Sequence, residues 1–173
     1  MHPFLKAISS LTFIASTVIL TSCAGYQLGG SKPQELKDVD TIYVTIAENK
    51  TQEIKLAPLF TNRLISFINN DGTYEVSTPS QSQATLNVVI DKIEYDEFRS
   101  SRFDTLLAEE LTATIHTTWQ LVDNQNKLLL KGKSSGKTRF FVEDNQRLAR
   151  ENSLYDAIDN LSRTITSGIS NGF

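Results

Sequence analysis

The chain has few of the side chains on which disulfide, metal and nucleophilic chemistry depends. Its 173 residues contain one cysteine and two histidines, and one of these, His2, lies at the extreme N-terminus. A single cysteine cannot form a disulfide within the chain, and zinc sites and catalytic triads need several such groups close together. We therefore expect no metal site, no cofactor and no enzymatic activity.

Sequence patterns that bind phosphate or present a nucleophile are also missing. We find no Gly-x-Gly-x-x-Gly pattern, no P-loop and no Gly-x-Ser-x-Gly pattern. Two carboxylates could in principle act as an acid/base pair on a saccharide. Acids in solvated strands and loops are usually surface residues, however, so the carboxylates at positions 91, 94, 96, 97, 109 and 110 do not change the expectation.

An excess of positive charge is absent too. The formal net charge is −3, so no global basic field exists to recruit nucleic acid, and any anion binding depends on a local cluster. The composition, 39% hydrophobic with no internal repeat, predicts one domain with one core.

The only cysteine, Cys23, stands just after an apolar run from residue 7 to residue 20. Lys6 supplies a short basic start, and the run is too short to span a ~30 Å bilayer core comfortably as a helix. Thr21 and Ser22 are small, which suits a peptidase cleavage site. The pattern resembles a bacterial lipoprotein signal at residues 1–22 and predicts that Cys23 is acylated. A cysteine that happens to end an ordinary cleaved signal is the alternative.

Acylation at Cys23 would anchor the mature protein at a membrane. Each buried methylene contributes roughly 0.8 kcal/mol, so two or three acyl chains hold a protein stably. Bacterial lipoproteins kept in the inner membrane commonly carry Asp directly after the cysteine, whereas Ala24 follows here. We therefore expect the outer membrane, on its periplasmic side.

Hydrophobic periodicity predicts the elements of a single domain at residues 41–173, after a tether at residues 23–40. β-branched or alternating residues predict strands at 41–46, 73–77, 86–95, 111–121 and 127–133, the last with an extension to 142 that continues or flanks it. Apolar residues at helical spacing predict helices at 56–69 and 145–169. The alternation shifts near Asp91, where we expect a β-bulge. The polar segment 48–51 predicts a turn.

This order of elements predicts an α+β fold. We expect a two-layer sandwich, in which a mostly antiparallel, four- to five-stranded sheet carries two helices on one face. The expected order is β-α-β-β-β-α, with one extra strand as an option.

Two short motifs stand at the start of the mature chain. Residues 23–28, Cys-Ala-Gly-Tyr-Gln-Leu, combine the cysteine with a Gly-Tyr pair, and residues 42–46 with 48–51, Glu-Asn-Lys-Thr, combine the first predicted strand with an Asn-x-Thr turn. Through these residues and its order of elements, the chain as a whole resembles the LptE family of lipopolysaccharide-assembly lipoproteins, which has a lipidated cysteine followed by a Gly-Tyr pair and a similar first strand and turn. The resemblance implies a subunit that plugs the outer-membrane barrel LptD, helps it assemble, and assists lipopolysaccharide transport to the outer leaflet.

A plug has to present a polar surface, because the interior of a large outer-membrane barrel is polar. The predicted strand at 111–121 offers such a surface, since one of its faces carries Thr112, Thr114, His116, Thr118 and Gln120. An ordinary solvated outer face of a sheet has the same composition, so that alternative stays open.

Candidate ligand contacts are basic, because lipopolysaccharide carries phosphates. Evenly spaced candidates, which would form one stripe on a continuous strand, are Lys131, Lys133, Lys137 and Arg139. Two further candidates lie between aromatic residues and are capable of bidentate phosphate contact: Arg99 and Arg102. The alternatives are that the lysines protect an edge strand from aggregation and that the arginines pair with nearby acids.

The first strand and its turn also resemble those of lipoproteins that activate a peptidoglycan synthase or assemble a secretion pore. Those proteins often carry a long disordered stalk after the cysteine, whereas here only residues 24–40 precede the first strand. The short tether favours a partner in the outer membrane itself. A carrier with an internal cavity is a third class, which the two-layer pattern does not suggest.

Overall fold

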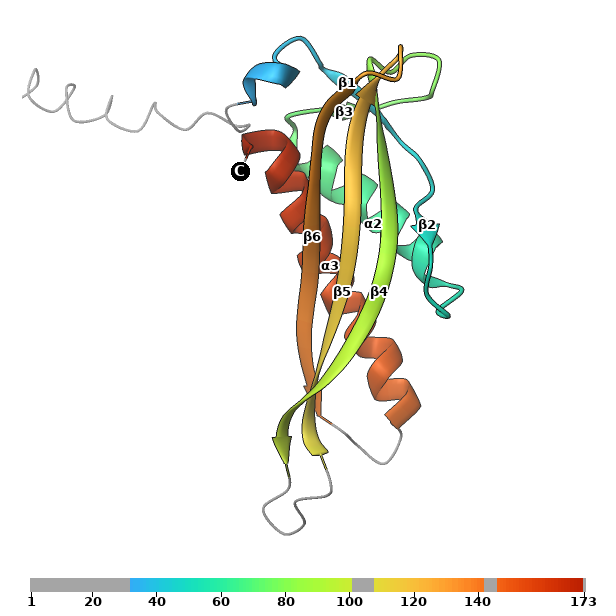
Figure 1. The fold of residues 1–173 in the computed structure, drawn as a ribbon, viewed down its shortest axis with the longest axis vertical. Coiled ribbons are helices and arrows are strands. Elements are labelled where there is room, and N and C mark those ends of the chain that lie inside the picture. The colour runs from blue at the N-terminus through green and yellow to red at the C-terminus, as the bar shows by residue number, and fades with distance from the viewer. Residues whose placement is uncertain (1–31, 101–107, 142–145, 173) are drawn as a thin grey trace, which may run out of the picture.

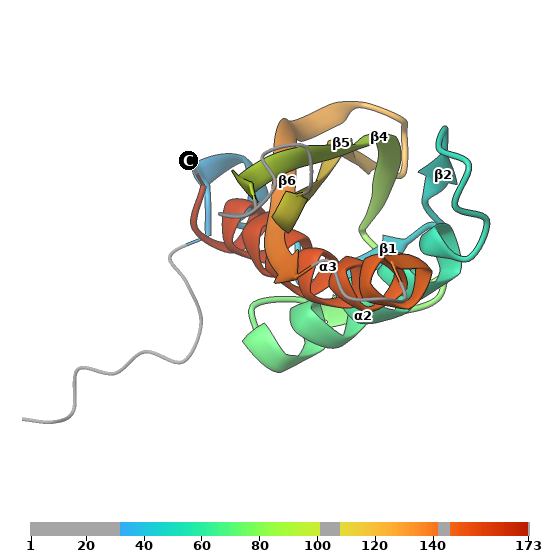
Figure 2. The same ribbon diagram turned by 90° about the horizontal axis from the view of Figure 1, so that it is seen from below.

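Two helices pack on one face of a six-stranded sheet (Figure 1). The computed structural model describes residues 32–100, 108–141 and 146–172. In chain order the elements are the 3-10 helix η1 (Gln34–Leu36), β1 (Thr41–Val44), β2 (Glu48–Asn49), α2 (Leu56–Asp71), β3 (Glu75–Val76), β4 (Ala84–Ser100), β5 (Ala108–Asp123), β6 (Leu128–Phe141) and α3 (Gln146–Asn171). Seen from below, α2 and α3 lie together on one side of the long strands (Figure 2). The α+β class with two helices is confirmed.

The sheet is mixed, with strand order β3-β1-β4-β5-β6 and β2 paired to β4. β1 lies parallel to both β3 and β4, and β2 is parallel to β4, whereas the pairs β4–β5 and β5–β6 are antiparallel. β1 and β3 are parallel because α2 carries the chain back between them. The prediction of a mostly antiparallel, four- to five-stranded sheet with one optional extra strand is therefore confirmed in part. It holds for the three long strands, whereas the short strands pair in parallel.

β2 lies where a polar turn was expected. Glu48 and Asn49 pair with Val89 and Ile90 of β4, and two residues are too few to show an alternating pattern. The turn follows directly, because Asn49 Oδ1 accepts hydrogen bonds from the Thr51 N–H at 3.0 Å and the Thr51 hydroxyl at 2.8 Å. The segment thus contributes both an additional strand and the expected Asn-x-Thr turn.

Helix α2 confirms the helix predicted at 56–69. Its core-facing side chains, which recur at every fourth position and are at most 3% exposed, are Leu56, Phe60, Leu64 and Ile68. The helix ends where Gly72 adopts a φ of +76° and donates its N–H to the Ile68 carbonyl at 3.2 Å. The left-handed conformation explains why glycine stops the helix at this point.

The core lies between the helices and the sheet. The single tryptophan, Trp119 on β5, is 1% exposed, and its Nε1–H donates to Ser134 Oγ on β6 at 3.0 Å. Tyr74, which precedes β3, donates its hydroxyl to the Ile169 carbonyl of α3 at 2.8 Å. Burial, together with Asp71, raises the pKa of Tyr74 to about 12. These buried hydrogen bonds tie β5 to β6, and the start of β3 to the end of α3.

The long strands carry the predicted bulge. The pairing of β4 with β5 shifts by one residue between Ile90 and Lys92, so the expectation of a bulge near Asp91 is confirmed. β6 runs without interruption from Leu128 to Phe141, so the extension after residue 133 continues the strand rather than flanking it. The three strands form a long antiparallel ribbon that extends beyond the short strands (Figure 1).

The N-terminal predictions lie outside the described residues. The signal at 1–22, the acylation of Cys23 and the first half of the tether, residues 23–31, therefore stay predictions. Among the described helices, none is both long enough and apolar enough to cross a membrane. In the same part of the chain, no group of three or more His, Cys, Asp or Glu side chains is placed to hold a metal ion.

Candidate binding face on the long strands

The face of β4, β5 and β6 that points away from the helices is polar. Residues of β5 alternate between this outer face and the core, where Ile115, Thr117 and Trp119 are buried. The intervening side chains, which include Thr114, His116, Thr118 and Gln120, are half-buried or exposed. The alternation predicted for this strand is confirmed, with Thr112 as an exception, because it is 3% exposed.

The predicted basic stripe lies beside this polar row. On β6, Lys131 pairs with Gln120, Lys133 with Thr118, Lys137 with Thr114 and Arg139 with Thr112. Side chains paired across a sheet lie on the same face, so the two predicted features form one surface. All four basic residues are exposed, and Ser135 stands between the second and third.

β6 is also the last strand of the sheet, as the edge-protection alternative requires. Among the described residues, Lys131, Lys133 and Lys137 take part in no ion pair. Their charges are therefore available to an external anion. Exposure on an edge strand suits both anion binding and protection from aggregation.

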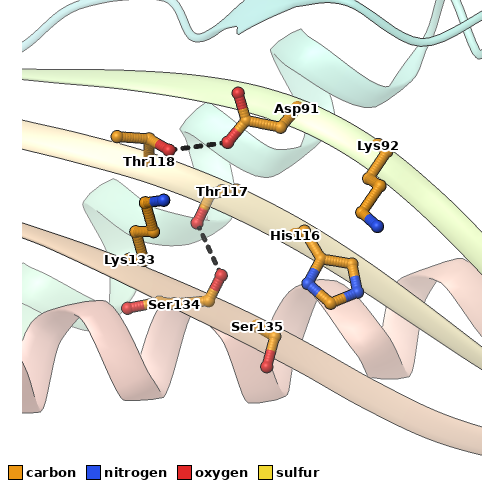
Figure 3. Close-up of a pocket in the computed structure, with 8 residues that line it drawn as sticks. All are labelled: Asp91, Lys92, His116, Thr117, Thr118, Lys133, Ser134 and Ser135. Carbon is orange, nitrogen blue, oxygen red and sulfur yellow. Dashed lines mark hydrogen bonds between the residues drawn. The ribbon is translucent and has the colours of Figure 1, made fainter.

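A depression of about 450 Å³ lies on the outer face, lined by residues of all three long strands (Figure 3). Lys92, His116 and Ser135 form one row across the strands, according to the strand pairings. Lys133 and Thr118 form the next row. The depression thus joins one lysine of the predicted stripe to a histidine and a lysine of the neighbouring strands.

His116 has a charged partner that the sequence did not suggest. Its Nε2 lies 2.8 Å from Glu94 Oε2 on β4, so the two side chains form an ion-pair contact across neighbouring strands. Lys92 donates a hydrogen bond to the other Glu94 oxygen. That hydrogen bond is the largest cause of the lowered pKa of Glu94. Partial burial opposes it, and the charge of Lys92 and the contact with His116 lower the pKa further.

The bulge at Asp91 places a second carboxylate beside the depression. Asp91 Oδ2 accepts a hydrogen bond from the Thr118 hydroxyl at 2.7 Å (Figure 3). Its other oxygen lies 3.7 Å from Lys50 Nζ. The depression therefore holds both signs of charge, with the carboxylates on β4 and Lys133 on β6.

Arg139 and Arg99 lie near the ends of β6 and β4, respectively. Arg139 stacks on the ring of Phe98, with its guanidinium carbon 3.8 Å from the ring centroid. Arg99 belongs to β4 and pairs with Glu110, but its side chain is outside the described part. Arg102 also lies outside the described residues. The structure therefore brings the four residues of β6 together and leaves the grouping of Arg99 and Arg102 with them a prediction.

The sequence missed the cluster of Lys92, Glu94 and His116. Their meeting depends on the register of β4 against β5, which no pattern within a single strand determines. The only local signal is the placement of Lys92 and Glu94 two residues apart, which puts them on one face of a strand. Chemically, the cluster and the lysines can bind an anion through hydrogen bonds and charge.

Comparison with known proteins places the chain in a family. The family model LptE, described as lipopolysaccharide-assembly, matches residues 39–169. The chain belongs to the LptE family. This match spans every strand and almost all of α3, and it confirms the resemblance found in the sequence. No curated protein matches the chain.

Solved structures share the fold of this LptE-family protein. A candidate lipoprotein from Caulobacter crescentus is 16% identical, with 74% of this chain and 86% of that chain covered and a TM-score of 0.53. A minor lipoprotein from Acinetobacter baumannii is 13% identical, with coverages of 76% and 93% and a TM-score of 0.52. A PelC dodecamer from Paraburkholderia phytofirmans gives 11% identity, coverages of 82% and 94%, and a TM-score of 0.52. At these identities the likeness concerns the fold alone.

Proposed function

We propose that this LptE-family protein is an outer-membrane lipoprotein that plugs the barrel LptD and helps it assemble. In this role it assists the transport of lipopolysaccharide to the outer leaflet. The observation that carries the proposal is the family match over residues 39–169. Acylated Cys23 would hold the protein on the periplasmic side of the membrane, and the protein has no catalytic role.

The outer face of the long strands supports the plug role. A subunit inside a large barrel meets a polar wall, so it needs hydrogen-bonding groups rather than an apolar surface. Thr114, Thr118 and Gln120 supply such groups on β5 without adding charge. The helices leave this face uncovered, as Figures 1 and 2 show.

The basic stripe supports direct contact with lipopolysaccharide. The exposed cations of Lys131, Lys133, Lys137 and Arg139 suit the phosphates of that lipid, and Arg99 and Arg102 are further candidates. Phe98, which is 45% exposed beside Arg139, offers apolar surface to a sugar or acyl chain. We assign phosphate contact to β6 because its charges have no internal ion-pair partner in the described ranges.

The test is affinity purification of the full-length lipoprotein from detergent-solubilised envelopes, with quantitative mass spectrometry of the proteins that accompany it. The proposal requires a large outer-membrane barrel in roughly equal molar amount. Recovery of a peptidoglycan synthase or a secretion ring without a barrel would contradict it and favour the alternative function.

Membrane sorting is tested separately with Ala24→Asp. Because Asp after the acylated cysteine commonly retains lipoproteins in the inner membrane, the variant should move there on a density gradient. If Ala24→Asp stayed in the outer membrane, the sorting argument would be wrong, whereas the barrel partnership would stand.

A further inference from the structure

Strand β4 has neighbours on both sides only in its first half. β1 and β2 pair with residues 84–86 and 89–90, and the last hydrogen bond on that side runs from the Lys50 N–H to the Ile90 carbonyl at 3.0 Å. From Lys92 onward, β5 is the only strand that pairs with β4 among the described residues. The second half of β4, from Lys92 onward, is therefore an edge of the sheet, which we call the lower edge of β4.

The Asn-x-Thr turn is the local cause of this open edge. Besides its two bonds to Thr51, Asn49 donates its side-chain amide to the Glu53 carbonyl at 2.8 Å. These bonds turn the chain away from β4 directly after β2.

The register identifies the backbone groups that are left over. Beyond the bulge, Lys92 and Glu94 pair with His116 and Thr114, and alternate residues of an antiparallel strand direct their N–H and C=O to opposite sides. The Ile90 carbonyl faces away from β5, because it accepts a hydrogen bond from Lys50. The bulge inserts one residue after Ile90, so the alternation moves on by one residue. Beyond the bulge, the backbone groups that face away from β5 are therefore those of Ile93 and Tyr95. No hydrogen bond within the described part of the chain reaches those groups.

The surface beside the edge is concave and partly apolar. A depression of about 320 Å³ lies between this edge and residues 50–53, with Ile93 and Tyr95 in its wall. A second depression, of about 310 Å³, lies on the other side of residues 52–53 and contains Ile54 and Tyr155. These two side chains are 89% and 55% exposed. On the opposite face of the strand, the edge carries Lys92 and Glu94, which are paired with each other, and then Asp96.

We propose that the lower edge of β4, residues 92–98, accepts an extended segment of a partner protein as an added strand. Main-chain hydrogen bonds to Ile93 and Tyr95 would provide affinity, as in other cases of strand addition. Successive side chains of a strand point to opposite faces, so the segment alternates apolar residues toward Ile93 and Tyr95 with basic residues toward Asp96. Within the described residues, the ion pairs do not include Asp96. The inference is independent of lipopolysaccharide binding because it uses none of the basic residues of β6.

A second copy of this chain fits the edge less well. The other long edge, on β6, has basic residues on its outer face but small residues, Gly132, Ser134 and Gly136, on the other. Its Lys137 carbonyl already accepts a hydrogen bond from the Asn160 side chain of α3 at 2.9 Å. The middle of the β6 edge, where these small residues lie, therefore offers little apolar side chain for Ile93 and Tyr95 to contact.

The test uses the mature protein and short synthetic peptides that alternate valine with lysine. Binding is followed by backbone amide NMR, with a valine–glutamate peptide as the charge control. We expect the valine–lysine peptide to shift and protect the amides of Ile93 and Tyr95. The glutamate peptide should bind about tenfold more weakly or not at all. Shifts centred on β6, or none at the highest soluble peptide concentration, would overturn the proposal.

Two controls separate strand pairing from general attraction. A valine–lysine peptide with alternate backbone amides N-methylated keeps its charge but cannot complete a ladder, so it should lose binding. Asp96→Lys should weaken the unmodified peptide about tenfold, whereas Asp38→Lys, at another exposed acid, should not. Equal binding of the methylated peptide would overturn the proposal. So would dimerisation through residues 92–98 without peptide, because the occupant would then be a second copy.

Discussion

The backbone of β6 at Gly136 lies so close to α3 that a Cβ atom there would come within 2.0 Å of the Ala157 carbonyl oxygen. The same atom would lie 2.5 Å from the Cβ of Leu161, so backbone and side chain of α3 both block it. Such distances require a shift of the helix or the strand. The contact between the two layers at this point depends on the missing side chain of glycine.

Gly136→Ala is therefore expected to destabilise the domain strongly. Overpacking a well-packed interior typically costs about 1–3 kcal/mol and occasionally more, and a clash with backbone leaves little room for relief. The measurement is urea unfolding of the mature protein followed through the fluorescence of Trp119, which is the single tryptophan.

Gly72→Ala is the matched control for this prediction. Gly72 has a φ of +76°, and nothing lies within 4 Å of the added Cβ. The substitution therefore costs conformational strain only, about 1–2 kcal/mol. If Gly136→Ala unfolded at the same urea concentration as wild type, the close packing of α3 on β6 would be refuted.

The Glu94 carboxylate links stability to pH. Its pKa is lowered in the folded protein, first by the hydrogen bond from Lys92 and then by the charges of Lys92 and His116. A lowered pKa stabilises the fold above the ordinary glutamate value of about 4.3, and that stabilisation is lost as pH falls through the folded-state pKa. Wild type should thus exceed Glu94→Gln in unfolding free energy near neutral pH, and the difference should shrink in acid.

Lys92→Met tests the cause of this linkage. Because the hydrogen bond and the charge of Lys92 are main causes of the lowered pKa, the variant should lose most of the lowering, and burial then opposes the weaker effect of His116. The measurement is unfolding free energy between about pH 5 and pH 2 for wild type and both variants. A pH dependence that Lys92→Met left unchanged would assign the effect to another group.

The helices and the outer face were predictable because their signals are local. The spacing of apolar residues from Leu56 to Ile68 and the turn residues ending at Gly72 define α2 to within two residues. Even spacing alone placed Lys131, Lys133 and Lys137 on one face, since it requires only that β6 be continuous.

Long-range pairings were not predictable. The contact of Glu94 with His116 depends on register across residues 101–107, and the parallel placement of β4 beside β1 depends on the path of the chain after β3. β2 was not predicted because it is only two residues long and both of them, Glu48 and Asn49, are polar. These features follow from tertiary packing rather than from a pattern within one segment.

The basic stripe gives a direct test of lipopolysaccharide contact. The triple variant Lys131→Gln, Lys133→Gln, Lys137→Gln removes three exposed cations from one face of β6 while keeping long polar side chains. If these cations meet phosphates, the variant should bind lipopolysaccharide on the order of tenfold more weakly, or about 1.4 kcal/mol. Its affinity should also depend less on salt, because fewer charged contacts remain to be screened.

A control triple with the same change in net charge shows whether a loss of binding comes from the basic stripe itself or from the lower net charge of the protein. Lys37, Lys55 and Lys127 are exposed and lie outside β6, so their replacement by Gln alters the net charge equally without touching the stripe. Binding of labelled lipopolysaccharide is measured at two salt concentrations for both triples. Equal losses would show that only net charge matters. No loss in either triple would leave the lysines with the edge-protecting role, and the β6 triple should then show a greater tendency to aggregate.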